Sequence, residues 1–361
     1  MARAILHIGT PKTGTTFLQG TFASDRKILQ SAGITYPDFD KYDSHTQLAL
    51  AFNPSDGIRH QQWGVTDRAE TLATIAKNLT ASIEPESRFV FSTESAARLT
   101  DDQVRELYIF LQQFFDEITI LVYLRRRDFM LASFFSQKLK AGSRNTSWKT
   151  AIRKLQTHEP NALLDRWSRV AGATNVIARP FLERYKQTPD ALLVDFCTHV
   201  ETDSGALTSP VANDATATNT SLNAEGAQLL QALNPLIPGH TTNGDHNHQL
   251  RAQLVARVLR ITQGPPLRVP AGMLERANQR FLLSNTELSR RMGADPLWQE
   301  WLDQPSPRTR EDSAEKLTAA RTAELMAALS VPAGPVDFSQ PDWRPRDWRR
   351  DVRKRIAKTI R

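Results

Sequence analysis

The residues best suited to chemistry lie at the start of the chain, in the stretch HIGTPKTGTT at positions 7–16. Gly9 and Gly14 have the spacing of the two glycines in a Walker A loop, G-x-x-x-x-G-K-[ST]. The lysine of that pattern would follow Gly14, but Thr15 stands there and Lys12 lies inside the loop. Backbone N–H groups of such a loop, at the start of a helix, bind anions. The stretch therefore predicts an anion site with a displaced cation, and the alternative is a plain strand-to-helix turn with a surface lysine.

A second candidate anion site follows the apolar run ITILVYL at 118–124. Arg125 comes directly after the run, and Ser133 lies eight residues further on, about two turns into a predicted helix. In open α/β sheets, ligands bind at the carboxyl ends of the strands, and a guanidinium group offers a planar fork to an oxyanion. Two anion sites on one sheet edge would suit a nucleotide with phosphates at both ends. The alternative for Arg125 is a salt bridge at the entry to the helix.

Together the two stretches resemble the sulfotransferases that use 3′-phosphoadenosine 5′-phosphosulfate (PAPS). GTPKTGTT is similar to their loop for the 5′-phosphosulfate, and LRRRDFMLAS is similar to their 3′-phosphate motif, with its arginine and serine eight residues apart. The family motif often reads R-N-P, whereas positions 125–128 read RRRD, a departure that resembles a bacterial branch thought to act on carbohydrates or glycolipids. GITYPD, NTSLNAEG and RFLLSNTELSRRMG also resemble segments of that branch.

The resemblance implies in-line transfer of a sulfuryl group from PAPS to a hydroxyl or amine of an acceptor, a carbohydrate or a glycolipid. It implies that Lys12 stabilises the oxygen of the departing 5′-phosphate, as cations do in phosphoryl transfer. No divalent metal is required, because sulfate carries less charge than a γ-phosphate. The residues that the resemblance assigns to the donor are Pro11, Lys12, Thr13, Gly14, Thr15, Thr16, Arg125 and Ser133.

An alcohol acceptor also needs a general base, which contributes roughly 10²–10⁴ in rate. Glu94 directly follows the predicted strand RFVFST, and His45 precedes a predicted helix in the connection after the first strand and helix. The alternatives are a cap or arginine partner for Glu94 and a hydrogen-bonding role at the helix entry for His45. Asp38 and Asp40 are weaker candidates.

The elements that must position these residues alternate between strand and helix. Apolar runs predict strands at 4–8, 88–92, 118–124 and 175–181, with the glycine loop after the first. Helices are expected at 15–31, 66–83, 101–117, 128–142 and 161–172, and then, with no clear strand, at 222–234, 245–263, 269–291 and 311–329. This order favours an α/β fold with a parallel sheet flanked by helices, similar to P-loop nucleotide hydrolases, plus a helical C-terminal half. We expect a core at 1–205, a helical extension of the same domain at 206–340 and a basic amphipathic tail at 341–361.

Composition and the distribution of charge limit the classes of partner that the protein is expected to bind. Of the 361 residues, 40% are hydrophobic and 24% charged, as in ordinary globular proteins. The last 19 residues hold nine basic and two acidic groups and account for the whole net charge of +7, so a nucleic-acid-binding body is not supported. Apolar and basic residues in this tail suit a helix on anionic lipid, and the alternatives are a docked helix or a solubilising end. We expect a cytoplasmic protein, with a peripheral contact to the inner membrane face if the tail binds lipid.

Two further features are expected to be structural. Cys197, the single cysteine, lies in an apolar helical pattern and reads as a buried thiol. His246 and His248 are two residues apart, which does not place them on one helix face, so we expect no metal there. Arg126 and Arg127 are expected to be solvated or paired with Asp128.

Two other functions remain open at this point. A P-loop kinase that uses ATP or GTP is disfavoured, because no lysine follows Gly14 and a second anion site follows the third strand. A binding module that holds a nucleotide or a glycan without turnover would keep the same loop. Such a module would not need a general base, so the presence of that base distinguishes an enzyme from it.

Overall fold

The chain divides into two compact units in a computed structural model that describes residues 2–39, 43–55, 60, 63–84, 86–207, 221–237, 248–310 and 317–330. The first unit consists of Met1–Arg126, His158–Asn213 and Leu282–Pro305, and the second consists of Arg127–Thr157, Asp214–Phe281 and Ser306–Arg361. This division differs from the expected boundary near residue 205. The chain passes from one unit to the other five times.

The first unit is built on a parallel sheet of five strands in the order β2-β3-β1-β4-β5. The strands are β1 Arg3–Ile8, β2 Ile34–Thr35, β3 Arg88–Thr93, β4 Glu117–Leu124 and β5 Val176–Pro180. β3 and β4 each contain a run of five buried residues, 89–93 and 120–124, because helices cover both faces of the sheet. The expected α/β fold with a parallel sheet is confirmed.

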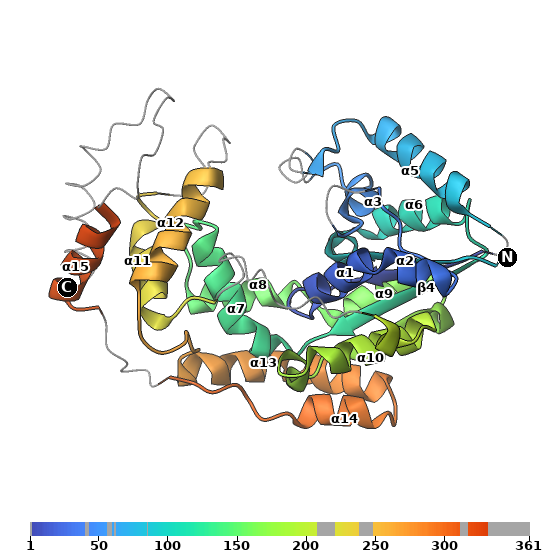
Figure 1. The fold of residues 1–361 in the computed structure, drawn as a ribbon. Helices are drawn as coiled ribbons and strands as arrows, with labels where there is room; N and C mark the ends of the chain where they lie inside the picture. Colours follow the sequence, from blue (N-terminus) through green and yellow to red (C-terminus); the bar gives the residue numbers. More distant parts are fainter. Residues whose placement is uncertain are drawn as a thin grey trace, which may run out of the picture. The chain divides into compact units, whose positions relative to one another are not determined.

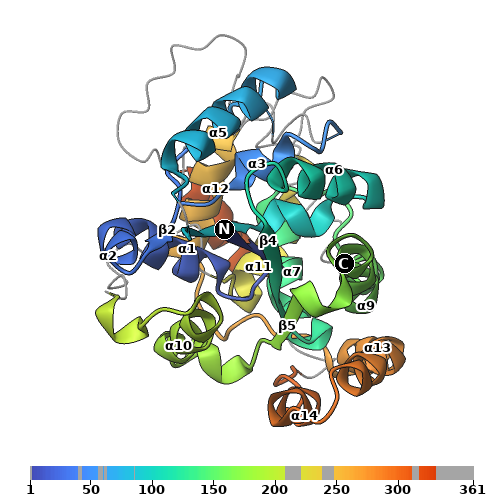
Figure 2. The same cartoon turned by 90° about the vertical axis from the view of Figure 1, so that its right-hand side faces the viewer.

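Helices cover both faces of this sheet. Figure 2 shows α1, α2 and α10 on one face and α6 and α9 on the other. Right-handed crossovers explain this arrangement, because the chain leaves β1 toward β2 on one side of the sheet and leaves β3 and β4 in the opposite direction. The helices of the first unit that lie between or after its strands are α1 Thr15–Ser24, α2 Arg26–Ser31, α3 Thr46–Leu50, α5 Arg68–Ser82, α6 Asp101–Leu111, α9 Pro160–Ala171 and α10 Pro189–Val200.

A late segment completes the core of the first unit. Helix α14, Pro296–Asp303, contributes the fully buried side chains of Trp298 and Trp301. The indole Nε1 of Trp301 donates to the carbonyl of Leu124 at 3.0 Å, at the carboxyl end of β4. Residues near the C-terminus of the chain therefore support the strand that leads into the second predicted anion site.

The described part of the second unit is helical apart from isolated bridges. α11 packs against α7 and α12, and α12 packs against α15 (Figure 1). Its own hydrophobic core includes Leu229, Leu230, Val258 and Phe281. The helices that contribute to this unit are α7 Arg127–Lys140, α8 Trp148–Gln156, α11 Ala224–Leu233, α12 His248–Ile261, α13 Ala271–Arg291 as far as Phe281, and α15 Ala319–Ser330.

Several expected elements differ in detail from those in the structure. The single helix expected over 15–31 is wrong: Asp25, with φ −102° and ψ 21°, separates α1 from α2. The short edge strand β2 was not expected, and neither were the helices α8 and α14. The tail at 341–361 lies outside the described residues, as do Asp40 and His246.

The described residues show neither a membrane-spanning helix nor a metal-binding cluster. None of the helices there combines the length and the apolar character that crossing a bilayer requires. Those residues also contain no group of three or more histidine, cysteine or acidic side chains arranged to hold a metal ion. Cys197 is buried, and burial raises the pKa of its thiol to about 12.

Candidate functional site at the carboxyl edge of the sheet

The glycine loop joins the carboxyl end of β1 to the start of α1 and has a left-handed backbone at two positions. Lys12 has φ 68° and Gly14 has φ 76°. A Cβ on Gly14 would lie 2.4 Å from Cδ2 of Leu192, so both the backbone angle and the neighbouring side chain require glycine there. The strand, loop and helix expected from the sequence are present, and the loop has the strand-to-helix context of an anion site.

Three threonine hydroxyls tie this loop to its surroundings. Thr10 Oγ1 donates to the carbonyl of Tyr123 at 2.6 Å, and Thr13 Oγ1 donates to the carbonyl of Thr10 at 2.7 Å. Thr15 Oγ1 donates to Oε1 of Glu94. Thr13 and Thr15 are buried, whereas Thr16 is exposed. Of the threonines assigned to the donor, Thr16 therefore has the accessible hydroxyl, and Thr13 and Thr15 hold the loop in shape.

Lys12 is the exposed cation at the tip of the loop. Its ammonium group makes no hydrogen bond or ion pair with the residues that the structure describes, and its neighbour Pro11 is half-buried. The charge of Lys12 is therefore available to a ligand. An anion site requires such an available charge, whereas a plain strand-to-helix turn does not.

Arg125 follows β4 and meets the same edge of the sheet. Its guanidinium group donates to both carboxylate oxygens of Glu183, from Nε at 2.6 Å and from Nη2 at 2.9 Å. Nη1 lies 3.4 Å from the carbonyl oxygen of Lys12, which brings Arg125 to the glycine loop. The side chain of Arg125 is only 3% exposed and lies over the ring of Phe181. A salt bridge is therefore present, as the alternative reading expected, but its partner follows β5.

Glu183 also accepts a hydrogen bond from Lys186 Nζ at 2.6 Å. Burial, followed by repulsion from Arg125, lowers the pKa of Lys186, and the charge of Lys12 acts in the same direction. Arg125 and Lys186 thus share one carboxylate, and the charge of Lys12 acts on Lys186, so the excess of positive charge favours an anionic ligand at this edge. Sequence reasoning missed Glu183 and Lys186, although the charged stretch ERYK directly after the fifth predicted strand could have indicated them.

Ser133 lies on α7 and belongs to the second unit, whereas Arg125 belongs to the first. Its hydroxyl donates to the carbonyl of Met130 at 3.0 Å, one turn earlier in the same helix. The joint action of Arg125 and Ser133 on one phosphate therefore stays a prediction.

The two candidate bases have different surroundings. Glu94 follows β3, is half-buried, and receives the hydroxyl of Thr15 on one carboxylate oxygen. A Cβ on Gly9 would lie 3.0 Å from Cγ of Glu94, so the glycine permits the close approach of this side chain to the loop. The structure thus brings Glu94 and the anion loop together at the carboxyl edge.

His45 lies in the core and binds two backbone groups. Its Nε2 lies 3.0 Å from the carbonyl oxygen of Pro37, and its Nδ1 accepts the N–H of Ser92 at 2.9 Å. Burial lowers the pKa of His45 to about 4. Since both ring nitrogens are engaged and the side chain is 1% exposed, this geometry contradicts a role for His45 as general base. His45 instead joins the start of α3 to β3.

The two arginines after Arg125 are buried and not solvated, while the alternative that they pair with Asp128, which is also buried, stays a prediction. Arg126 Nη1 donates to the carbonyls of Leu302 at 2.8 Å and Gln304 at 2.6 Å, at the C-terminus of α14. These bonds satisfy carbonyl groups that the end of a helix leaves without partners. Arg127 lies over the ring of Phe281 within the second unit, with its guanidinium carbon 4.4 Å from the ring centre.

Comparisons with known proteins were made at the level of families, curated sequences and solved structures. The chain matches no protein-family model, and no curated protein sequence matches it. Among solved structures, it is similar to a sulfotransferase from Alicyclobacillus acidocaldarius, with 13% identity, a TM-score of 0.37 and coverage of 70% of this chain and 94% of that one.

Two sulfotransferase domains show the same level of likeness. The domain from the Synechococcus PCC 7002 olefin synthase is 13% identical with a TM-score of 0.33, over 73% of this chain and 96% of that one. The domain from the curacin biosynthetic pathway is 12% identical with a TM-score of 0.38, over 78% of this chain and 98% of that one. Because all three TM-scores are below 0.5, we argue function from the residues and geometry of the site.

Proposed function

We propose that the carboxyl edge of the sheet in the first unit transfers a sulfuryl group from PAPS to a hydroxyl or amine of an acceptor. The observation that carries this proposal is the placement of Lys12, exposed and unpaired among the described residues, at the tip of a loop whose backbone contacts Arg125. A lysine after Gly14 would reach along the phosphates of a nucleoside triphosphate. A lysine at the tip of the loop suits a donor in which the positive charge stabilises the bridging oxygen as it departs.

The residues of the loop have distinct parts in this proposal. Backbone N–H groups at the start of α1 and the exposed hydroxyl of Thr16 would bind the 5′-phosphosulfate. Lys12 would stabilise the negative charge that develops on the bridging oxygen as its bond to sulfur breaks. Arg125 would bind the 3′-phosphate with the remaining hydrogens of its guanidinium group, and a part of Ser133 in that binding rests on the sequence resemblance alone.

Glu94 is our choice of general base. It would accept the proton of the acceptor hydroxyl while the acceptor oxygen forms its bond to sulfur and the 5′-phosphate departs with the electrons of the broken bond. The hydrogen bond from Thr15 leaves Oε2 of Glu94 for that proton and fixes the orientation of the carboxyl group. His45 is not proposed, because its ring nitrogens are engaged in the core.

The acceptor and the cellular setting rest on the sequence resemblance alone. We propose a carbohydrate or a glycolipid as acceptor, no nucleic-acid partner and no required metal. We also propose a cytoplasmic location, with a peripheral membrane contact through residues 343–361, which lie outside the described part of the chain.

Thermal unfolding with 3′-phosphoadenosine 5′-phosphate (PAP), beside ATP with Mg²⁺, tests the donor class. At a hundred times its Kd, a ligand of the folded state adds about 2.7 kcal/mol, enough to raise Tm by a few degrees. We expect a shift with PAP that Arg125→Ala abolishes, and transfer of ³⁵S from labelled PAPS to a member of an acceptor panel.

Two outcomes would replace the proposal. A shift with Mg-ATP alone would favour the P-loop kinase, in which Thr16 takes the metal-binding position of the Walker pattern. A shift with PAP but no transfer to any acceptor, with Glu94→Gln behaving like the native chain, would favour a binding module without turnover.

A further inference from the structure

A second concave site lies wholly within the second unit. It is a pocket of about 460 Å³ formed by the start of α11, the segment after α12, Arg310 and the start of α15. A volume of this size is in the range of small-molecule sites, which run from roughly 300 to 1,000 Å³. None of its lining residues has a part in the sulfuryl transfer proposed above.

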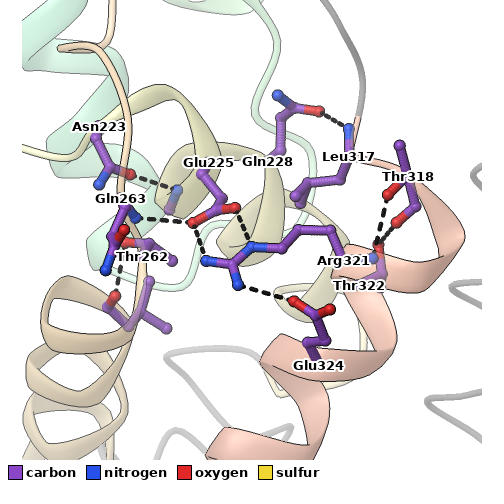
Figure 3. Close-up of polar contacts among 12 residues, drawn as sticks. Asn223, Glu225, Gln228, Thr262, Gln263, Leu317, Thr318, Arg321, Thr322 and Glu324 are labelled. Atoms are coloured by element: carbon purple, nitrogen blue, oxygen red, sulfur yellow. Dashed lines mark hydrogen bonds and ion pairs between the residues drawn. The ribbon is translucent and has the colours of Figure 1, made fainter.

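One side of the pocket consists of a closed network of charges (Figure 3). Arg321 donates to both carboxylate oxygens of Glu225, from Nε at 2.6 Å and from Nη2 at 3.1 Å, and Nη1 donates to Glu324 at 3.0 Å. Glu225 also accepts the backbone N–H of Gln263 at 2.8 Å. The hydrogen bond from Arg321 lowers the pKa of Glu225, so this carboxylate stays charged and matched. The network shapes the wall: Glu225 and Arg321, which line the pocket, neutralise each other, and Glu324, which also pairs with Arg321, does not line it.

The other side of the pocket carries two arginines whose charges are not compensated in this way. Arg268 and Arg310 are both half-buried, and neither side chain makes a hydrogen bond or an ion pair with a residue that the structure describes. Nε of Arg310 is buried and has no hydrogen-bond acceptor there. A buried donor without an acceptor is unfavourable, so the guanidinium group of Arg310 is not held by the described residues around it and would be stabilised by an anionic partner.

The backbone around these arginines is held in place. The N–H of Arg310 donates to the carbonyl of Val269 at 3.1 Å, and the carbonyl of Arg310 accepts from Ala271 at 3.2 Å. Arg268 lies directly before Val269, so both guanidinium groups originate from two segments that are hydrogen-bonded to each other. Two planar donors that originate from a fixed backbone suit a carboxylate or sulfate better than a single flexible cation would.

Apolar residues complete the lining. Pro265, Pro266 and Leu317 line the pocket and offer no side-chain hydrogen-bond donors. A bare inorganic ion would leave these surfaces without a contact, whereas a carbon skeleton would pack against them.

From this arrangement we infer that the pocket of the second unit binds a small organic oxyanion. Its carboxylate or sulfate group contacts Arg268 and Arg310, and its carbon skeleton packs on Pro265, Pro266 and Leu317. The site is separate from the proposed transfer reaction, and its existence does not depend on that reaction.

Isothermal titration of the full chain in 150 mM NaCl tests the inference with four probes: galactose 6-sulfate, glucuronate, neutral galactose and inorganic sulfate. We expect binding of one or both charged sugars, and at least tenfold weaker binding of galactose and of inorganic sulfate. Arg310→Gln and Arg268→Gln should each weaken the binding of the charged sugar at least tenfold. The affinity of Arg310→Lys should lie between the affinities of these variants and that of the native chain. Arg308→Gln is the matched control, because Arg308 is exposed and does not line the pocket.

Far-UV circular dichroism and the midpoint of thermal unfolding without ligand show whether each variant is folded, and neither readout depends on a ligand of the pocket or on the proposed transfer reaction. The inference is overturned if no charged sugar binds, if galactose binds as well as its sulfate, or if Arg308→Gln weakens binding as much as Arg310→Gln does. Equal binding of inorganic sulfate and galactose 6-sulfate would also overturn it, because the site would then take a free ion and not an organic ligand.

Discussion

Lys12 is the residue on which the proposed chemistry depends most directly. We expect Lys12→Met to lower the rate of sulfuryl transfer by about 10²–10³, the usual cost of removing one group that stabilises charge in the transition state. PAP affinity should change by less than tenfold, because the backbone of the loop remains. Single-turnover transfer from labelled PAPS measures the effect, with Lys27→Met, an exposed lysine on α2, as the matched control. Equal losses in both variants would exclude a specific role for Lys12.

Glu183 gives a second prediction at this scale, about stability. Glu183→Gln leaves the buried guanidinium of Arg125 without its carboxylate, which costs on the order of 3 kcal/mol for a buried pair. If PAP binds Arg125, its phosphate supplies the missing negative charge. We therefore expect the apo variant to melt several degrees lower than the native chain, and PAP to raise its Tm more than it raises the native Tm. An equal PAP shift in the two proteins would mean that the ligand does not contact Arg125.

The sequence allowed the loop residues to be recognised but not their partners. Gly9, Lys12 and Gly14 are local, so their spacing alone indicates an anion loop. Glu183 reaches Arg125 across 58 positions of the chain, and no periodicity encodes that contact. For His45 the sequence left open a general base and a hydrogen-bonding role at the helix entry, and the backbone partners of its ring are distant enough in sequence that only the structure reveals them.

At the scale of elements, the buried histidines link the segment before α3 and strand β1 to strand β3. His45 contacts the backbone of Ser92, and Nδ1 of His7 on β1 lies 2.9 Å from the hydroxyl of the same residue. Burial lowers the pKa of His45 to about 4 and that of His7 to about 3, from 6.5. Below pH 6.5 the unfolded chain therefore binds more protons than the folded one, and the stability of the fold decreases as the pH falls.

We expect the free energy of unfolding to fall by about 2 kcal/mol for each of these histidines between pH 7 and pH 5. Urea denaturation at pH 7, 6 and 5 measures this slope. His45→Gln cannot take up the proton, so in this variant the pH dependence that His7 and His45 together cause should be about half as large. This holds whatever the substitution does to stability at pH 7. If the slope of His45→Gln equals that of the native chain, the imidazole of His45 titrates alike in the folded and unfolded states.

Elements were predicted best where one physical signal dominates. The run ITILVYL is apolar from Ile120 onward because that part of β4 is covered on both faces, and its strand was expected within one residue of its bounds. The two-residue strand β2 has no pattern to detect, and α14 is a short helix whose importance lies in where Trp298 and Trp301 pack. The break at Asp25 falls inside a continuous helical pattern, which local propensity does not reveal.

At the scale of the whole molecule, neither unit is a continuous piece of the chain. A fragment of residues 1–205 contains all five strands but lacks α14. Loss of a buried tryptophan costs about 3–5 kcal/mol, so losing two removes much of the 5–15 kcal/mol that stabilises a typical protein. We expect this fragment to show no cooperative thermal transition and no PAP binding, with the full chain as control. A fragment that unfolded cooperatively near the native Tm would show that α14 is dispensable.

The contribution of α14 to the first core also has a consequence during synthesis. A ribosome adds roughly 5–20 residues per second, so about 15–60 s pass between the emergence of the glycine loop and that of the helix that binds the carbonyl of Leu124. Throughout that interval the carboxyl end of β4 lacks its covering indole, and Arg126 lacks the carbonyls that it contacts in the finished protein. The nascent chain would thus expose the carboxyl end of β4 until α14 has been synthesised, and chaperones that act at the ribosome bind such exposed apolar segments.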